Sequence, residues 1–156
     1  MTRPIELKPR EDEHPGTPWT AYQVGARTPD MDFTVTPAIV REYMEAIDAD
    51  PSAYVVDGRP AAPPNVLAVY LLAILYRKYP PIQGIILTEV SWRFHHPIWA
   101  DEDTEIVGRG EVTEKFEKRG KHFVRWKAEF RRRPDGLLLT EAANMMYVPL
   151  ERFEKR

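Results

Sequence analysis

The longest apolar run of this sequence is Val66-Leu67-Ala68-Val69-Tyr70-Leu71-Leu72-Ala73-Ile74-Leu75. Asn65 precedes the run as a good capping residue, and Arg77 and Lys78 follow it, where cations suit the negative end of a helix dipole. We therefore predict a helix that begins near Asn65. At about 1.5 Å per residue this run is too short to cross a bilayer, and a helix that is apolar on every face must be covered on every face.

Strand patterns follow Gly84, where apolar and polar residues begin to alternate. Val90, Trp92 and Phe94 form the apolar face of the first of these runs. Turn-forming residues separate the later runs, so we predict an antiparallel meander of four strands. The later runs are Glu105 to Thr113, Val124 to Arg131 and Leu137 to Val148, with turns at Glu117 to Lys121 and at Pro134 to Gly136.

Another helix and another strand are predicted before the apolar run. Thr36 is a suitable N-cap, and Pro37 suits the first position of a helix that should stop near Asp50, because Pro51 disfavours helical geometry in the residue before it. The alternation between Trp19 and Arg27 predicts a first strand.

The predicted order is strand, helix, loop, apolar helix and four strands. One sheet with one fully apolar helix favours an α+β hot-dog architecture, in which the antiparallel sheet wraps around that helix and a loop or a dimer partner covers the rest. We expect residues 1–18 to form an N-terminal arm, residues 19–150 a single domain and residues 151–156 a C-terminal tail.

Composition excludes several classes of protein. The 156 residues are 43% hydrophobic and 29% charged, which is an ordinary balance for one globular domain. A net charge of -2 predicts no binding to nucleic acid or to anionic membranes. The absence of cysteine excludes disulfides, thiolate zinc sites and a cysteine nucleophile. The charged N-terminus predicts no signal peptide, so we expect a cytoplasmic protein that needs no metal and no cofactor.

Three stretches resemble the MaoC-like hydratase/dehydratase family. Phe33 to Pro51 (FTVTPAIVREYMEAIDADP) is similar to the entry helix and active-site loop of its (R)-specific enoyl-CoA hydratases. Ala62 to Val66 (APPNV) resembles the start of their central helix, and Phe94 to Asp101 (FHHPIWAD) resembles a segment that often has the pattern F-H-R-P-I-x-x-G-D. The Ala-Pro-Pro form is similar to N-terminal-type halves of double hot-dog dehydratases and to subunits of heteromeric dehydratases.

The resemblance implies addition of water to a trans-2-enoyl thioester, or the reverse reaction, by the Asp and His of a D-x-N-P-x-H motif. Asp48 matches the catalytic Asp, Asp50 stands where Asn is usual, and Pro51 matches. Ala53 occupies the position where the family has its His. Asp48 is therefore a candidate catalytic residue, with a capping role at the end of the helix as the alternative.

The same resemblance implies that Pro63, Pro64, Asn65 and Val66 contact the substrate. Pro64 has no N–H to donate, but the amide of Asn65 could polarise a thioester carbonyl, or Asn65 could be only a helix cap.

His95 and His96 are the other candidates for substrate binding. Adjacent residues on a strand point to opposite faces, so at most one of them can point inward. The alternative is a structural pair at the end of a strand. Arg131 to Arg133 could contact a CoA phosphate, or it could be a solvated strand end.

These features predict a subunit of an enoyl-CoA hydratase or 3-hydroxyacyl-thioester dehydratase. The chain would be the acyl-binding half, its ligand an acyl-CoA or acyl-carrier thioester, and a partner chain would supply the Asp/His dyad. We expect a homo- or hetero-oligomer with another hot-dog subunit. The alternative is a non-enzymatic acyl-CoA-binding or scaffold homodimer. A hot-dog thioesterase needs a carboxylate on or beside the central helix, and Val66 to Leu75 carries none.

Overall fold

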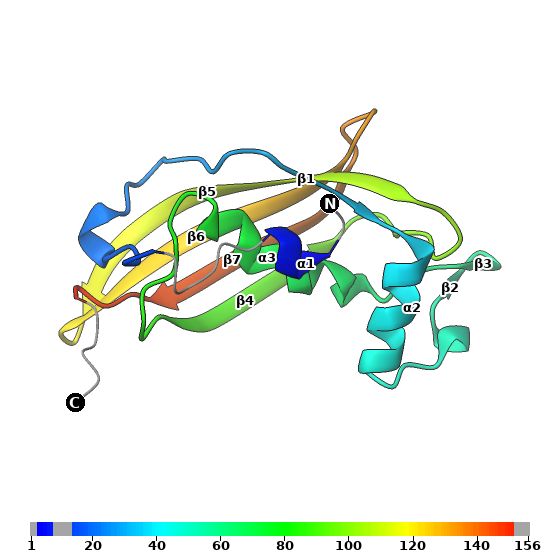
Figure 1. Cartoon of the computed structure of the whole chain (residues 1–156), viewed down its shortest axis with the longest axis horizontal. Coiled ribbons are helices and arrows are strands. Elements are labelled where there is room, and N and C mark those ends of the chain that lie inside the picture. Colours follow the sequence, from blue (N-terminus) through cyan, green and yellow to red (C-terminus); the bar gives the residue numbers. More distant parts are fainter. Residues whose placement is uncertain (1–2, 8–13, 152–156) are drawn as a thin grey trace.

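The computed structural model describes residues 3–7 and 14–151. A five-stranded antiparallel sheet, in the order β1-β5-β6-β7-β4, lies against one central helix, α3 (Ala68–Tyr76), as Figure 1 shows. The predicted α+β class is confirmed by this arrangement. The strands are β1 (Met31–Val35), β4 (Ile86–Phe94), β5 (Thr104–Lys118), β6 (Lys121–Arg132) and β7 (Leu138–Tyr147).

Two glycines allow α3 to approach the sheet closely. Gly108 and Gly110 lie on the inner face of β5, and a Cβ atom at Gly108 would come within 2.7 Å of Ile74 Cδ1. Ile74 is fully buried, as are Tyr70 on the same helix and Phe130 on β6. The apolar run therefore forms the centre of the hydrophobic core, as its composition predicts.

One side of α3 is not covered by this chain. Val69 is 45% exposed, and the neighbouring strand β4 is exposed along almost its whole length. The inner face of β4 is apolar, because Val90, Trp92 and Phe94 lie opposite inner-face residues of β7. In the single chain, the edge strand β4 therefore has unpaired backbone groups, and its apolar face and the open side of α3 are exposed to solvent.

The predicted four-strand meander is wrong in one pairing. β5, β6 and β7 follow one another through tight turns, but β4 pairs with β7 and not with β5. Residues 95–103 carry the chain across from β4 at one edge to β5. This connection is too long for a tight hairpin, so it does not force its two strands to be neighbours.

The predicted strand from Trp19 to Arg27 is also wrong. Trp19–Ala21 forms a 3₁₀ turn, η1, and the first strand is β1. Tyr22 is buried and stacks on Tyr79 at 4.3 Å between ring centroids. Only Arg27 forms a bridge to β5, with Glu111. The alternation of Tyr22 and Val24 with polar residues therefore did not mark a strand, because Tyr22 is buried in a connecting segment whereas Val24 is 60% exposed.

The short helix α1 (Pro4–Leu7) contacts α3, and Leu7 is buried. The division into an arm (1–18), a domain (19–150) and a tail (151–156) stays a prediction, since residues 1–2, 8–13 and 152–156 lie outside the described residues. Within the described part of the chain, no helix has the length and apolar character needed to span a membrane.

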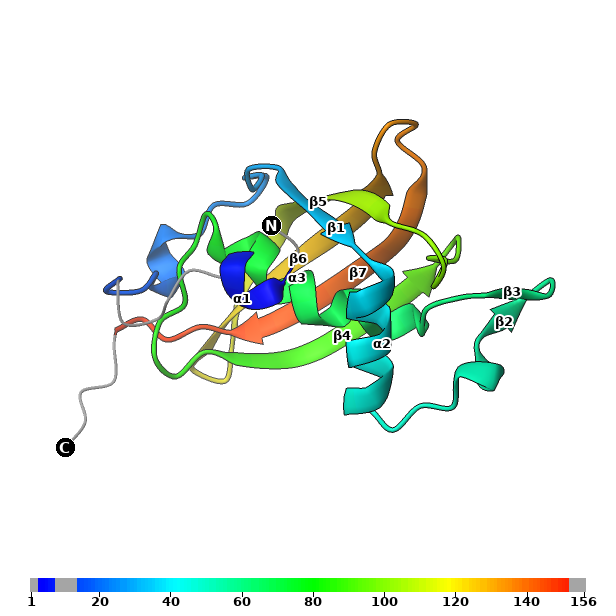
Figure 2. The same ribbon diagram turned by 45° about the vertical axis from the view of Figure 1, so that its right-hand side comes forward.

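The predicted helix at Pro37 is confirmed as α2 (Pro37–Ala46), with the Thr36 hydroxyl accepting a hydrogen bond from Ile39 N at 3.2 Å. It ends before Asp50, because Asp48 takes a left-handed conformation with a φ of 52°. A 3₁₀ turn, a small hairpin and a second 3₁₀ turn then lead to α3; Figure 2 shows α2 and the hairpin together at one end of the sheet. These elements are η2 (Pro51–Ala53), β2 (Val55–Val56), β3 (Arg59–Pro60) and η3 (Pro64–Leu67).

Candidate functional site

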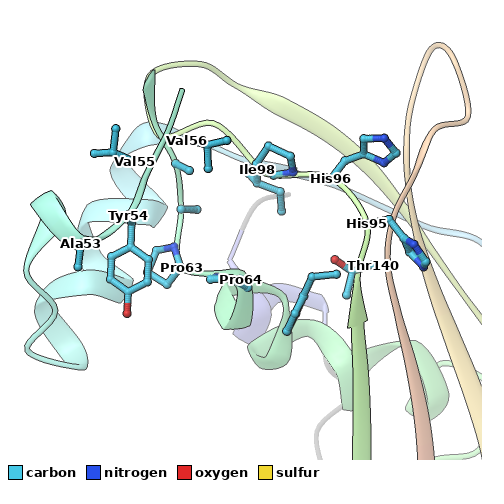
Figure 3. Close-up of a pocket in the computed structure, with 14 residues that line it drawn as sticks. Ala53, Tyr54, Val55, Val56, Pro63, Pro64, His95, His96, Ile98 and Thr140 are labelled. Carbon is cyan, nitrogen blue, oxygen red and sulfur yellow. The ribbon is translucent and has the colours of Figure 1, made fainter. Parts of the chain in front are cut away.

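A cavity of about 310 Å³ lies between the hairpin loop and the segment that leaves β4 (Figure 3). Alanine, valine, proline and aromatic side chains supply most of its wall. Such an apolar wall with few polar groups is typical of a site for an apolar ligand. The lining residues are Ala53, Tyr54, Val55, Val56, Ala61, Ala62, Pro63, Pro64, Phe94, His95, His96, Pro97, Ile98 and Thr140.

The hairpin wall is held in place by backbone hydrogen bonds. Ala61 N donates to Tyr54 O at 2.8 Å, and Ala62 N donates to Ile98 O at 2.7 Å. The tip of the hairpin is anchored by Arg59, which donates to both carboxylate oxygens of Asp101 and lies 4.4 Å over the ring of Trp99. Contacts within this chain therefore hold the hairpin wall of the cavity in place.

The two histidines line the cavity at its rim. His95 Nε2 lies 2.7 Å from Glu141 Oε2, and Figure 3 shows the His95 ring directed away from the cavity. Because Phe94 lies on the inner face of β4, the next side chain belongs to the outer face. His96 Nδ1 lies 3.0 Å from the carbonyl oxygen of Leu138. Both rings thus have protein partners outside the cavity.

Pro63 and Pro64 line the cavity, whereas Asn65 and Val66 do not. Val66 is fully buried in the core, and Asn65 is exposed within η3. The prediction that Asn65 caps the central helix is wrong, because the N-cap of α3 is Leu67 and Asn65 lies within the preceding turn η3. Pro60, Pro63 and Pro64 precede α3, and the helix begins after a 3₁₀ turn instead of after a side-chain cap.

MaoC-like dehydratases and (R)-hydratases are among the solved structures that resemble this chain. R-Hydratase PhaJ1 from Pseudomonas aeruginosa has a TM-score of 0.67 at 15% identity, over 90% of this chain and 94% of the other. The MaoC-like dehydratase from Rhodospirillum rubrum has a TM-score of 0.69 at 18% identity, over 90% and 100%. The HadBC (3R-hydroxyacyl-ACP dehydratase) complex from Mycobacterium tuberculosis has a TM-score of 0.63 at 20% identity, over 80% and 96%.

The chain has the hot-dog fold. No family model matches the sequence, and no curated protein matches it significantly. The hot-dog likeness is therefore one of structure, and the chemistry of the site has to be argued from the residues themselves.

Within this hot-dog domain, only one of the two positions expected for the Asp/His dyad lines the cavity. Ala53 lines the cavity, whereas Asp48 does not. Asp48 is exposed, and its N–H donates to Glu45 O at 3.2 Å, so it lies in the turn that ends α2. Asp50 accepts a hydrogen bond from Ser52 N at 2.9 Å, and this bond lowers the pKa of the Asp50 carboxyl.

The arginine run does not offer free cations for a phosphate. Arg131 pairs with Glu129 at 3.0 Å, and Arg133 pairs with Asp32. Arg132 pairs with Asp135 and lowers the pKa of that carboxyl to about 2. Each guanidinium therefore has an acidic partner on the protein surface.

The sequence led us to expect that the loop from Pro51 to Pro64 shapes the acyl pocket, but it did not single out Tyr54, Val55 and Val56, which line the cavity. The signal was present, because Asp57-Gly58 takes positive φ values of 50° and 77° and is a typical two-residue hairpin turn. Recognising this turn would have placed two valines on a hairpin beside the central helix.

In the part of the chain that the structure describes, no group of three or more His, Asp or Glu side chains could hold a metal ion.

Proposed function

We propose that this chain is the acyl-binding subunit of an enoyl-thioester hydratase or 3-hydroxyacyl-thioester dehydratase. The observation that carries the proposal is the apolar cavity, because Ala53 lines it at the position where the MaoC-like motif has its His. The hot-dog fold shared with hydratases and dehydratases supports the reaction class. Its ligand would be an acyl-CoA or acyl-carrier thioester in the cytoplasm.

The catalytic Asp/His dyad would come from a second hot-dog subunit. The exposed apolar inner face of β4 supports such a partner, as does Val69 on the open side of α3. Pairing of a second sheet with β4 would satisfy its free backbone groups and cover the helix. One structural neighbour, HadBC, is itself a complex. The catalytic role of Asp48 stays a prediction.

A non-enzymatic acyl-thioester-binding homodimer is the second candidate. It is favoured by the shortage of acid–base groups in the cavity, because the ring of His95 is turned away from it and Asp48 does not line it. The two candidates agree on the ligand and on a hot-dog partner. They differ in whether that partner carries an intact D-x-N-P-x-H motif.

The experiment measures hydration of crotonyl-CoA and binding of octanoyl-CoA by the purified full chain. We expect octanoyl-CoA to bind and crotonyl-CoA to be turned over negligibly. Val55→Asp is a suitable variant for binding, because Val55 lines the cavity but is 50% exposed, so that a charge there should abolish acyl binding without unfolding the protein. Val24→Asp, at another exposed valine, is the matched control.

Robust turnover by the chain alone would contradict the binding-subunit proposal and would indicate that Asp48 works with an unusual base. If the chain is inactive, its partner is identified by co-purification. A second chain with the intact motif that restores hydration supports the hydratase, whereas a homodimer that binds octanoyl-CoA supports the second candidate.

A further inference from the structure

Thr140 is a buried residue whose hydroxyl is directed into the cavity. Its side chain lies on the inner face of β7, it is only 3% exposed, and Figure 3 shows its oxygen pointing into the space opposite Pro63 and Pro64. In the described residues, no hydrogen bond of Thr140 Oγ1 is found. The hydroxyl opens onto the cavity and can therefore hydrogen-bond to a molecule held there, which makes this position unusual within a wall of apolar side chains.

The surroundings of Thr140 offer it no obvious partner in the protein. Its cross-strand neighbours are Phe94 on β4 and Phe130 on β6, so aromatic rings flank it on the inner face. Trp92 extends this aromatic wall, because its ring stacks on Phe94 at 6.0 Å and on Phe130 at 6.5 Å. Of these rings, only that of Phe94 lines the cavity, so an apolar ligand could lie along Phe94 with the hydroxyl as its fixed polar contact.

The backbone around the cavity has few hydrogen-bond donors to spare. The N–H groups of Ala53, Ala61 and Ala62 donate to backbone carbonyls of the protein. The N–H groups of His95 and His96 both donate to Leu139 O. Three prolines in the lining have no N–H at all. Thr140 therefore offers one of the few donors that a ligand oxygen entering this cavity could meet.

We propose that the Thr140 hydroxyl donates a hydrogen bond to an oxygen atom of the acyl group held in the cavity. This inference rests on the proposed function, since it assumes that the cavity takes an acyl chain. The oxygen is either the thioester carbonyl, which every acyl thioester carries, or an oxygen substituent such as a 3-hydroxyl group. Thr140 would then be a specificity residue that fixes how far the chain slides into the cavity.

The test compares octanoyl-CoA with 3-hydroxyoctanoyl-CoA, using calorimetric titration of the full chain. Thr140→Val keeps the shape of the side chain and removes the hydroxyl, and it should weaken binding by about fivefold, as expected for one neutral hydrogen bond. Weakening of both ligands identifies the thioester carbonyl, and weakening of the hydroxylated ligand alone identifies the 3-oxygen. Thr140→Ser keeps the hydroxyl and should bind as the wild type does.

Ser91→Ala is the matched control, because Ser91 is exposed on β4 opposite Ala143, on the outer face of the sheet. It should change neither affinity. If octanoyl-CoA binds and Thr140→Val binds both ligands like the wild type, this inference is overturned while the proposed function stands. If the wild type binds neither ligand, both fail. Thermal unfolding of Thr140→Val checks that any loss of binding does not come from loss of the fold.

Discussion

Close contact between α3 and β5 can be tested by the substitution Gly108→Ala. The new Cβ would lie 2.7 Å from Ile74 Cδ1 and 3.0 Å from Ile74 Cγ1, so Ile74 or the helix must move. Overpacking of this kind costs about 1–3 kcal/mol. Gly108 does not have a positive φ, so alanine is allowed there and recovers about 0.4–1 kcal/mol from the unfolded state. We expect a net loss of about 1–2 kcal/mol in the free energy of unfolding.

A second substitution determines whether that loss comes from Ile74. Ile74→Val removes Cδ1, the atom nearest to the new methyl group, and alone should cost about 0.5–1.5 kcal/mol. In the double variant the alanine methyl occupies the space that Cδ1 leaves. The double variant should therefore be about as stable as Ile74→Val alone, which corresponds to a coupling free energy of about 1–2 kcal/mol.

Urea unfolding of the four proteins, followed by circular dichroism, measures these free energies. The dependence on urea should be the same for all four, because the surface exposed on unfolding hardly changes. Strictly additive losses, or a Gly108→Ala variant as stable as the wild type, would refute the packing of Ile74 over Gly108. The placement of the central helix on the inner face of the sheet would then have to be abandoned.

Two further predictions concern Tyr22 and Val69. Burial raises the pKa of the Tyr22 phenol above its ordinary value of 10.0, so the folded state holds the phenol proton more tightly than the unfolded state does. Below pH 10 the phenol is protonated in both states, and its contribution to stability is complete. As the pH rises above 10, the free energy of unfolding falls by about 1.4 kcal/mol per pH unit. Tyr22→Phe should remove this loss, which urea unfolding at pH 8 and pH 11 would reveal; an unchanged difference between the two proteins would refute it. Val69→Lys should shift an oligomer of this chain towards the monomer in sedimentation velocity. Val24→Lys, also at an exposed valine, should cause no such shift. Equal behaviour of the two variants would exclude the open side of α3 from the interface.

The parts of the fold that were predictable from the sequence are those in which local pattern and packing agree. β6 alternates strictly from Val124 to Arg131, and tight turns fix β5, β6 and β7 as neighbours. β4 has an equally clear alternation, but its neighbour depends on the path of residues 95–103, which no local pattern determines. The segment from Trp19 to Arg27 shows the opposite case, because Tyr22 and Val24 alternate with polar residues as in a strand although the segment is a loop and Val24 is exposed.

The site was predictable in outline and not in detail. Sequence comparison with the MaoC-like motif placed Ala53, Pro63 and Pro64 near the substrate, and all three line the cavity. The direction of a side chain at a strand end was not predictable, so the outward turn of His95 had to come from the structure. Thr140 lies far along the chain from these residues, and only the pairing of β4 with β7 brings it to the cavity.

The composition of the cavity supports our proposal that binding and chemistry are divided between two chains. Hydration needs a water molecule held by two to four polar partners and activated by a base. The cavity wall is mostly valine, alanine and proline, and Thr140 is the hydroxyl that Figure 3 shows directed into it, so the wall offers few of the partners that such a water needs. The same wall suits an acyl chain, whose burial stabilises the complex by about 0.8 kcal/mol for each CH₂ group. Introducing an acid–base dyad here would require charges in the apolar space that holds the chain, and their desolvation would oppose their ionisation. Placing the dyad on a partner that faces the open side of α3 avoids that conflict.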